Sequence, residues 1–240
     1  MYLLFLALAP AFLIMVYVYF RDKYEKEPIG LILKGFLLGA IIIFPVGLIE
    51  NSIKDFAVGF DKIPKAAYDG FLVAGATEEI FKFLMVFILI WRNPNFNEKF
   101  DGIVYAVSVA LGFATIENLF YVFSNNSLQV GLLRAFTAVP AHAIFGIVMG
   151  FYLGLARFSQ NKKGRWLLMA LFLPWLLHGI YDFILMSGHP LLLLTFIPFL
   201  IFMYRHGLRR MKELSYQSVF NPNNINFTNN GETYSNKDNS

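Results

Sequence analysis

The chain has 240 residues, of which 57% are hydrophobic and 18% aromatic, while only 15% are charged. Soluble domains carry about 25% charged residues, so this composition indicates a membrane protein and excludes an ordinary soluble enzyme. The chain contains no cysteine, which excludes disulfides and thiolate chemistry. Basic loops on one side of a membrane account for the net charge of +4, and we expect no nucleic-acid partner.

Seven apolar stretches are long enough, or nearly so, to cross a bilayer, which takes about 20 helical residues. In chain order they are residues 1–20, 30–49, 66–91, 101–123, 131–156, 166–186 and 190–204. The first lacks a basic start and a cleavage site of small residues, so we interpret it as an uncleaved helix. The sequence therefore predicts an all-α, polytopic bundle of about seven transmembrane helices in a cell membrane, with the lipid bilayer as its surroundings.

The basic residues fall unevenly on the two sides of such a bundle. One side receives Arg21, Lys23, Lys26, Lys34, Arg92, Lys99, Arg157, Lys162, Lys163, Arg165, Arg205, Arg209, Arg210 and Lys212. The other side receives Lys54, Lys62, Lys65 and Arg134. Because cytoplasmic loops are enriched in lysine and arginine, we expect the amino terminus outside and the carboxyl terminus in the cytoplasm.

Two regions of different composition divide the chain. Residues 1–212 contain all the apolar stretches and are predicted to form one transmembrane domain. Residues 213–240 are rich in asparagine and poor in aliphatic residues, so they cannot bury enough apolar surface to offset their ordering entropy. We predict that they form a disordered cytoplasmic tail.

Apart from charges near the span ends, such as Lys34, ionisable residues inside the predicted spans are few, and they occur on four consecutive helices. They are Glu78, Glu79, Lys82, Glu117, His142, His178 and Asp182. A charge in hydrocarbon costs roughly 2.5–3.5 kcal/mol on insertion scales, so each of these residues needs a partner or a function. At about 1.5 Å of rise per residue, all four helices carry them roughly 9 to 18 Å from the predicted outer ends. They could therefore line one water-accessible cavity in the outer half of the membrane.

The two adjacent glutamates are expected to play different parts. Glu78 is four residues from Lys82 and Glu79 is three, so either can pair with the lysine. Neighbouring helical residues diverge by about 100°, so one glutamate faces the site while the other is held by charge. We favour Glu78 as the working carboxylate. Asp182, four residues after His178, can orient the histidine ring and fix its tautomer.

The residue types leave two kinds of hydrolytic chemistry open. A serine mechanism is disfavoured because Ser108 has no obvious base, and the His-Glu-x-x-His pattern of a zincin helix is absent. Glutamate and histidine can bind a metal that acidifies a water molecule. Alternatively, a glutamate of raised pKa activates water directly while histidines stabilise the oxyanion, and then no cofactor is needed.

The ordered motifs of residues 66–186 resemble those of the PrsW family of bacterial intramembrane proteases, relatives of the CAAX-type prenyl endopeptidases. The matching residues are Glu78-Glu79-x-x-Lys82, Phe113-x-x-x-Glu117, Pro140-Ala141-His142 and His178-x-x-x-Asp182. Glu-Glu-x-x-Lys and a glutamate in the second motif are typical of PrsW, whereas the CAAX enzymes have Glu-Glu-x-x-x-Arg and a histidine there.

This resemblance implies a membrane-embedded endopeptidase of the bacterial cytoplasmic membrane. It implies a site-1 cut on the extracytoplasmic side of a single-pass anti-sigma factor, which leads to release of the sigma factor under envelope stress. The implied catalytic residues are Glu78, Glu79, Glu117, His142, His178 and Asp182. If a metal is present, zinc held by Glu117, His142 and His178 is the expected cofactor.

Two other classes of function remain to be weighed. A proton-coupled transporter also uses buried Glu, His and Asp residues, but it needs a path to both faces and usually has inverted repeats. No repeat is visible, and the polar residues avoid the cytoplasmic half. A non-catalytic membrane scaffold would keep these residues as structural ion pairs, and a complete motif set argues against it.

Overall fold

A computed structural model describes residues 2–227 and 233–235, and within them the chain is almost entirely helical. The helices are α1 (Tyr2–Arg21), α2 (Ile29–Ile53), η1 (Lys54–Ala57), α3 (Lys62–Tyr68), η2 (Asp69–Ala76), α4 (Thr77–Ile90), α5 (Asp101–Asn125), α6 (Leu128–Phe136), α7 (Ala138–Arg157), α8 (Lys163–Ser187), α9 (Pro190–Tyr216) and η3 (Pro222–Asn224). Two short strands, β1 (Ile225–Phe227) and β2 (Thr233–Ser235), pair in antiparallel fashion.

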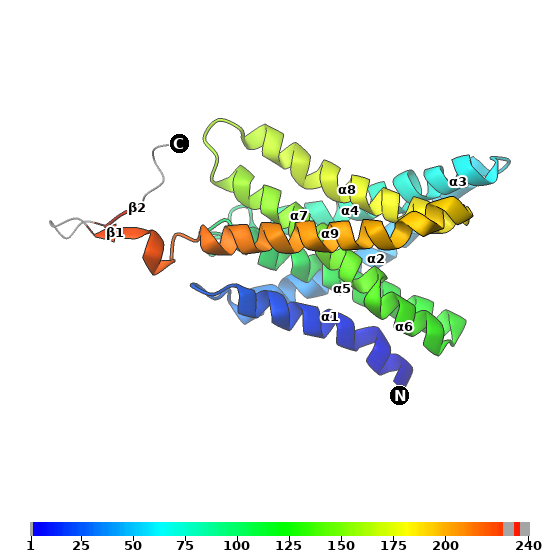
Figure 1. Ribbon diagram of the computed structural model, residues 1–240, viewed down its shortest axis with the longest axis horizontal. Coiled ribbons are helices and arrows are strands. Elements are labelled where there is room, and N and C mark those ends of the chain that lie inside the picture. The colour runs from blue at the N-terminus through cyan, green and yellow to red at the C-terminus, as the bar shows by residue number, and fades with distance from the viewer. Residues whose placement is uncertain (1, 228–232, 236–240) are drawn as a thin grey trace.

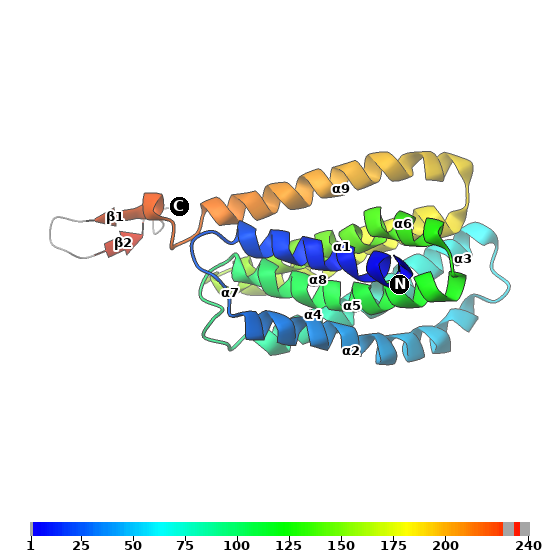
Figure 2. The ribbon, with the colours of Figure 1, turned by 90° about the horizontal axis from the view of Figure 1, so that it is seen from below.

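The long helices run side by side along one axis, and their connections gather at two ends (Figures 1 and 2). We call the end with loops 22–28, 91–100 and 158–162, where α9 also finishes, the basic end. Turns 54–61 and 126–127 lie at the opposite end, near α3 and α6. In Figure 2, α9 and α2 cover opposite sides of the bundle, and α1 and α5 lie between them.

Helix α5 is the centre of the bundle, and glycines allow its neighbours to approach its backbone. Every residue from Asp101 to Thr115 is buried. A Cβ atom on Gly39 of α2 would lie 1.9 Å from the carbonyl oxygen of Val109, and one on Gly112 would lie 1.9 Å from that of Phe36. Helices in membranes associate through such close backbone contacts, because lipid offers no hydrophobic driving force between them.

The outer helices present large apolar side chains that no other part of the described chain covers. Phe12 on α1 is 68% exposed, Phe44 on α2 is 62% exposed and Leu194 on α9 is 74% exposed. Side chains of this kind are stable in contact with lipid tails. The distribution of apolar surface therefore agrees with a bundle whose inner helix is α5 and whose outer helices face the bilayer.

A π-helical segment, η2, interrupts the third apolar stretch just before Glu78 and packs directly against α8. The indole Nε1 of Trp175 donates a hydrogen bond of 2.6 Å to the carbonyl oxygen of Phe71. A Cβ atom on Gly179 would lie 2.2 Å from the ring of Phe71, so only glycine fits there without a shift. Because π-helical turns often occur at functional sites, this junction of η2 and α8 directs attention to the side chains around it.

The predicted all-α polytopic bundle is confirmed, with some changes in its helices. Six helical segments are long and apolar enough to cross a membrane. The remaining stretch, predicted at 66–91, belongs to the continuous run α3–η2–α4, which carries six charged residues and changes helix type. The stretch 131–156 divides at Thr137 into α6 and α7, because the backbone there leaves helical geometry (φ −120°, ψ −68°).

The last helix is longer than its apolar sequence indicated. The predicted span 190–204 becomes α9, which continues through polar residues to Tyr216. Residue 213, where the predicted tail begins, therefore lies inside this helix. Residues 228–232 and 236–240 of that tail lie outside the described residues. The orientation of the termini across the membrane stays a prediction.

The close contact between α2 and α5 generates a test of stability. Gly39→Ala forces the two backbones apart, and we expect a loss of about 1–3 kcal/mol, the usual effect of overpacking. Gly47→Ala in the same helix is the control, because no atom lies within 4 Å of its added Cβ. Thermal unfolding of both variants in detergent should show a lower midpoint for Gly39→Ala alone. Equal midpoints would contradict the backbone contact.

Candidate active site

The ammonium group of Lys82 lies among residues of three helices. Its Nζ donates hydrogen bonds to Glu78 Oε2 at 2.8 Å and to Glu79 Oε1 at 2.9 Å, both on α4. It also lies 3.1 Å from Nδ1 of His142 on α7 and 4.2 Å from the ring centroid of Phe113 on α5. Lys82 is 1% exposed and Glu79 is fully buried, so these charges are satisfied by one another rather than by water.

His178 on α8 links Asp182 to this network through its contact with Glu79. Its Nδ1 is 2.9 Å from Glu79 Oε1 and its Nε2 is 3.2 Å from Asp182 Oδ2. The ring also stacks on Phe145 of α7, with centroids 4.9 Å apart, and meets His142 edge-on at 5.3 Å. The predicted pairing of His178 with Asp182, one helical turn later, is therefore present.

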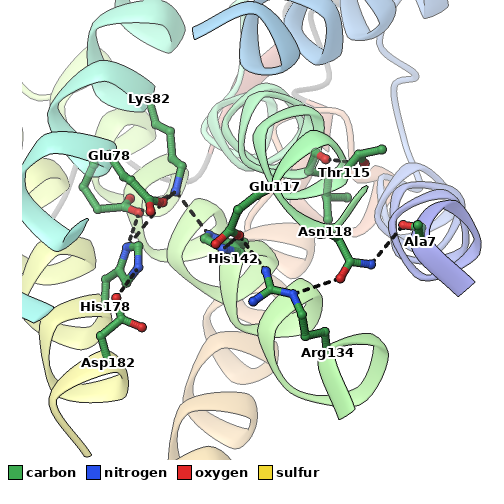
Figure 3. A network of polar contacts seen from close by, with 12 residues as sticks. Ala7, Glu78, Lys82, Thr115, Glu117, Asn118, Arg134, His142, His178 and Asp182 are labelled. Carbon is green, nitrogen blue, oxygen red and sulfur yellow. Dashed lines mark hydrogen bonds and ion pairs between the residues drawn. The ribbon is translucent and has the colours of Figure 1, made fainter. Parts of the chain in front are cut away.

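Glu117 of α5 approaches His142 from the other side. Its Oε2 lies 2.9 Å from Nε2 of His142 and 2.8 Å from Nη2 of Arg134 on α6 (Figure 3). Arg134 Nε in turn donates to Asn118 Oδ1 at 2.9 Å, and the amide of Asn118 donates to the carbonyl of Ala7 on α1 at 3.1 Å. A continuous chain of polar contacts thus leads from α4 to α1.

Hydrogen-bond roles follow from the partners of each histidine. A lysine ammonium can only donate, so Nδ1 of His142 accepts from Lys82, and Nε2 carries the proton toward Glu117. His142 is thus neutral in this arrangement. Both ring nitrogens of His178 face carboxylates, which only accept when ionised, so this ring carries two protons. The two histidines therefore differ in charge and in the hydrogen bonds that they can offer.

A cavity of about 880 Å³ connects this network with the end of the bundle opposite the basic end. Its deep wall contains Glu78, His142 and His178, and its outer part reaches Asp55 and Val58 beyond the end of α2. Glu79, although adjacent to Glu78, is not part of the cavity wall. This is the division expected for the pair: one glutamate faces the cavity, and the other is enclosed by Lys82 and His178. Which glutamate activates water stays a prediction.

The structure gathers all six residues predicted for the site into this one network, and it adds two that the sequence analysis missed. From the sequence, Arg134 was counted only among the basic residues of one membrane side. Its charge within the predicted span 131–156 was itself a signal of a site residue. Glu50 lies one residue beyond the predicted span 30–49. It lines the same cavity, and its Oε1 is buried without a hydrogen-bond partner among the described residues.

Comparisons with known proteins agree with this geometry. Residues 27–204 match the family described as PrsW family intramembrane metalloprotease. The chain belongs to the PrsW family. It is 38% identical to Protease PrsW of Bacillus subtilis (strain 168) over 207 residues, which are 86% of this chain and 92% of that protein.

Two further relatives are similar to nearly the same extent. Protease PrsW of Clostridioides difficile (strain 630) is 38% identical over 216 residues, which cover 88% of this chain and 90% of the relative. Protease PrsW of Halalkalibacterium halodurans is 35% identical over 210 residues, with 88% and 95% coverage. No solved structure matches the chain. As a PrsW-family member, the protein is a membrane-embedded endopeptidase and a multi-pass bacterial membrane protein.

The PrsW family is described as metalloproteases, and the side chains of this site are suitable for a metal. One ligand atom from each of Glu78, Glu79, His142 and His178 lies within 4.8 Å of the others. Histidine nitrogen and carboxylate oxygen are the donors of catalytic zinc sites. Glu79 also has a buried oxygen, Oε2, that accepts no hydrogen bond. Because Lys82 already touches three of these four residues, zinc binding requires its ammonium to move aside.

This group differs from the predicted zinc ligands Glu117, His142 and His178. Glu117 is outside it, and its Oε2 contacts Arg134 and the far nitrogen of His142 instead. The structure thus offers Glu79 in place of Glu117 beside the two histidines. Which of these residues hold a zinc ion stays a prediction.

The position of Lys82 generates a second test of stability. Lys82→Met removes the ammonium but keeps an apolar stem, which leaves Glu78 and Glu79 buried without their cation. We expect a loss of about 3–5 kcal/mol, as when one partner of a buried ion pair is removed. The control is Lys65→Met, whose pair with Asp69 is exposed and is expected to contribute about 0–1 kcal/mol. Unfolding in detergent measures both, and similar losses would contradict a structural role for Lys82.

Proposed function

We propose that this protease makes the site-1 cut in a single-pass anti-sigma factor, on its extracytoplasmic side, and so starts sigma-factor release under envelope stress. The observation that supports this most is the cavity, which extends from Glu78 and the two histidines to the end of the bundle opposite the basic loops. By the positive-inside rule that end is extracytoplasmic. A bond cleaved there would lie near the outer surface of the substrate's transmembrane segment.

In the proposed reaction, Glu78 is the base. It faces the cavity, so it can accept a proton from the attacking water and pass it to the leaving amine. While no metal is bound, Glu79 and Asp182 hold His178 in its charged form, which can donate a hydrogen bond to the oxyanion when one carboxylate contact is exchanged; as a ligand in the zinc site proposed below, His178 would instead be neutral and the zinc would polarise the carbonyl. Glu117, fixed by Arg134, holds the tautomer of His142. Each role follows from the contacts of that side chain, and no two residues have the same role.

We further propose that His142, His178 and Glu79 hold a zinc ion, as a two-histidine, one-glutamate set. Bound zinc lowers the pKa of a water ligand to about 7 and polarises the carbonyl to be cleaved. Metal binding at these residues would release one ring proton of His178, leave the N–H that faces Asp182, and displace the ammonium of Lys82. Glu78 would then remain free to act as the base.

The first test is cleavage of an anti-sigma factor co-expressed with the protease. Glu78→Gln and His178→Ala should abolish the first cut, because they remove the base and a histidine of the site. Accumulation of both variants in the membrane is checked by immunoblot. Glu213→Gln and His206→Ala, both near the basic end, are matched controls and should cleave normally. Normal cleavage by both site variants would contradict the proposed site.

The second test separates the two possible sets of metal ligands. Zinc content is measured on purified protein, with about one ion per chain expected for the wild type. Glu79→Gln and His178→Ala should lose the zinc, whereas Glu117→Gln should retain it because Glu117 binds Arg134 instead. The reverse result for the two glutamates would favour the set predicted from sequence. Full protease activity after complete removal of zinc would exclude a metal mechanism.

A third test concerns the orientation on which the extracytoplasmic cut depends. A reporter fused after Gly164, in the first turn of α8 at the basic end, should be cytoplasmic. One inserted between Asn126 and Ser127, at the opposite end, should be outside. Alkaline phosphatase and a cytoplasmic fluorescent protein give opposite signals at the two positions. If the pattern is inverted, the cavity opens to the cytoplasm and the site-1 proposal fails.

A further inference from the structure

A second group of carboxylates lies at the basic end of the bundle, away from the cavity of the protease site. It joins the loop between α1 and α2 to the segment that leads into α5. Its members are Asp22, Glu25, Glu27, Glu98 and Asp101. Four of them are almost completely enclosed: Asp101 is 0% exposed, Asp22 and Glu27 are 1% exposed, and Glu98 is 2% exposed. Such burial of carboxylates is rare unless a positive charge accompanies them.

The neighbouring hydrogen bonds satisfy only part of this group. The hydroxyl of Tyr105 donates to Glu27 Oε2, and the backbone N–H groups of Asn97 and Glu98 donate to Asp101 Oδ2 at 2.8 and 2.7 Å. Glu27 and Asp101 also share a side-chain hydrogen bond, and Glu98 bonds to Ser218 and to the backbone of Val219. Apart from these contacts, one oxygen on each of the five acids is buried without a hydrogen-bond partner within the described residues. These oxygens are Asp22 Oδ2, Glu25 Oε2, Glu27 Oε1, Glu98 Oε2 and Asp101 Oδ1.

Nearby basic side chains form no ion pair with the group. Lys26 lies in the same loop, but its Nζ donates to the backbone carbonyls of Tyr19 and Asp22. Among residues 2–227, no lysine or arginine forms an ion pair with any of the five acids. By contrast, the buried carboxylates of the protease site have Lys82 and Arg134. The two acidic groups of this protein are therefore built differently.

The free-energy cost of burying these carboxylates is visible in the pKa of Asp22. Burial, reinforced by the negative charge of Glu98, raises the pKa of Asp22 to about 7. A cation placed among these oxygens would reverse both the desolvation and the mutual repulsion.

The oxygens are also close enough to share one ion. One ligand oxygen from each of Glu25, Glu27 and Asp101 lies within 4.8 Å of the other two. All donors are carboxylate oxygens, with no histidine or sulfur, and this is the ligand set of hard cations rather than of zinc. We propose that this cluster binds a hard divalent cation, Ca²⁺ or Mg²⁺, which ties the α1–α2 loop to the start of α5.

This inference does not depend on the protease mechanism, because it uses no residue of the protease site. With the proposed orientation, the cation would be bound on the cytoplasmic side, where Mg²⁺ is the available ion. Its effect would be structural: α5 carries Glu117 and Phe113 further along, and the ion would fix the position at which this helix begins.

The test uses full-length protein in detergent, with Ca²⁺ alone and Mg²⁺ alone at millimolar concentration. At about 100 times the dissociation constant, either ion should raise the thermal midpoint by roughly 5–10 °C. Glu27→Gln and Asp101→Asn should abolish that shift. Glu213→Gln is the matched control, because Glu213 pairs with Arg210 at the same end, and it should keep the full shift.

Calorimetric titration of the wild type provides a second measurement that does not depend on how the variants fold. It should show one Ca²⁺ or Mg²⁺ per chain, and the two ions should compete. Absence of saturable binding by either ion would overturn the proposal. So would a thermal shift of equal size in wild type and Glu27→Gln, because the ion would then act elsewhere. A His178→Ala background should keep the shift, which separates this site from the zinc site.

Discussion

The buried ammonium group of Lys82 is the interaction on which the arrangement of the site depends. Two adjacent glutamates on one helix would repel each other at this depth, and each would lose most of its hydration. Lys82 contacts both carboxylates and also reaches His142 of α7, so one side chain joins α4 to the opposite wall of the site. Removing Lys82 would leave both glutamates buried without the cation that they share, which explains why the three residues occur together in one short motif.

Close packing of helix backbones makes this network geometrically possible. Side chains as short as glutamate and histidine can bridge four helices only if the helix axes are near one another. Gly39 and Gly112 bring α2 against α5, and Gly179 admits the ring of Phe71 between η2 and α8. The glycines near the polar residues thus set the distances across which the ion pairs form. The resulting contacts continue through Arg134 and Asn118 as far as the backbone of α1.

The sequence predicted much of the site because membrane burial makes a polar residue conspicuous. Glu78, Glu117, His142 and His178 stand out in apolar stretches, and helical spacing correctly paired His178 with Asp182. Spacing along single helices could not show which residues of different helices meet. For that reason the contact of Glu117 with Arg134, and the exchange of Glu117 for Glu79 among the possible metal donors, were not foreseen.

Helix boundaries were predicted less well, also for a physical reason. Apolar length marks the part of a helix that lies in lipid, whereas a helix can continue into water. Helix α9 continues beyond its apolar part in this way. Helix α2 also extends past its apolar stretch, so Glu50 was left outside the predicted span although α2 includes it. The π-helical turn before Glu78 has no signature in hydropathy at all. The acidic cluster at the basic end was similarly hidden, because its members are distant in sequence and lie in segments that read as ordinary polar loops.

The cavity has a consequence for the conformation of a bound substrate. At about 30 Å³ per water molecule, its volume of about 880 Å³ has room for roughly thirty of them. Within hydrocarbon, a transmembrane helix cannot open, because its freed N–H and C=O groups would find no partners. Beside a wet cavity those groups can bond to water instead, so the energy needed to unwind a helix falls at this depth. The enzyme would thereby convert a protected helical segment into an extended one at the level of its own reactive groups.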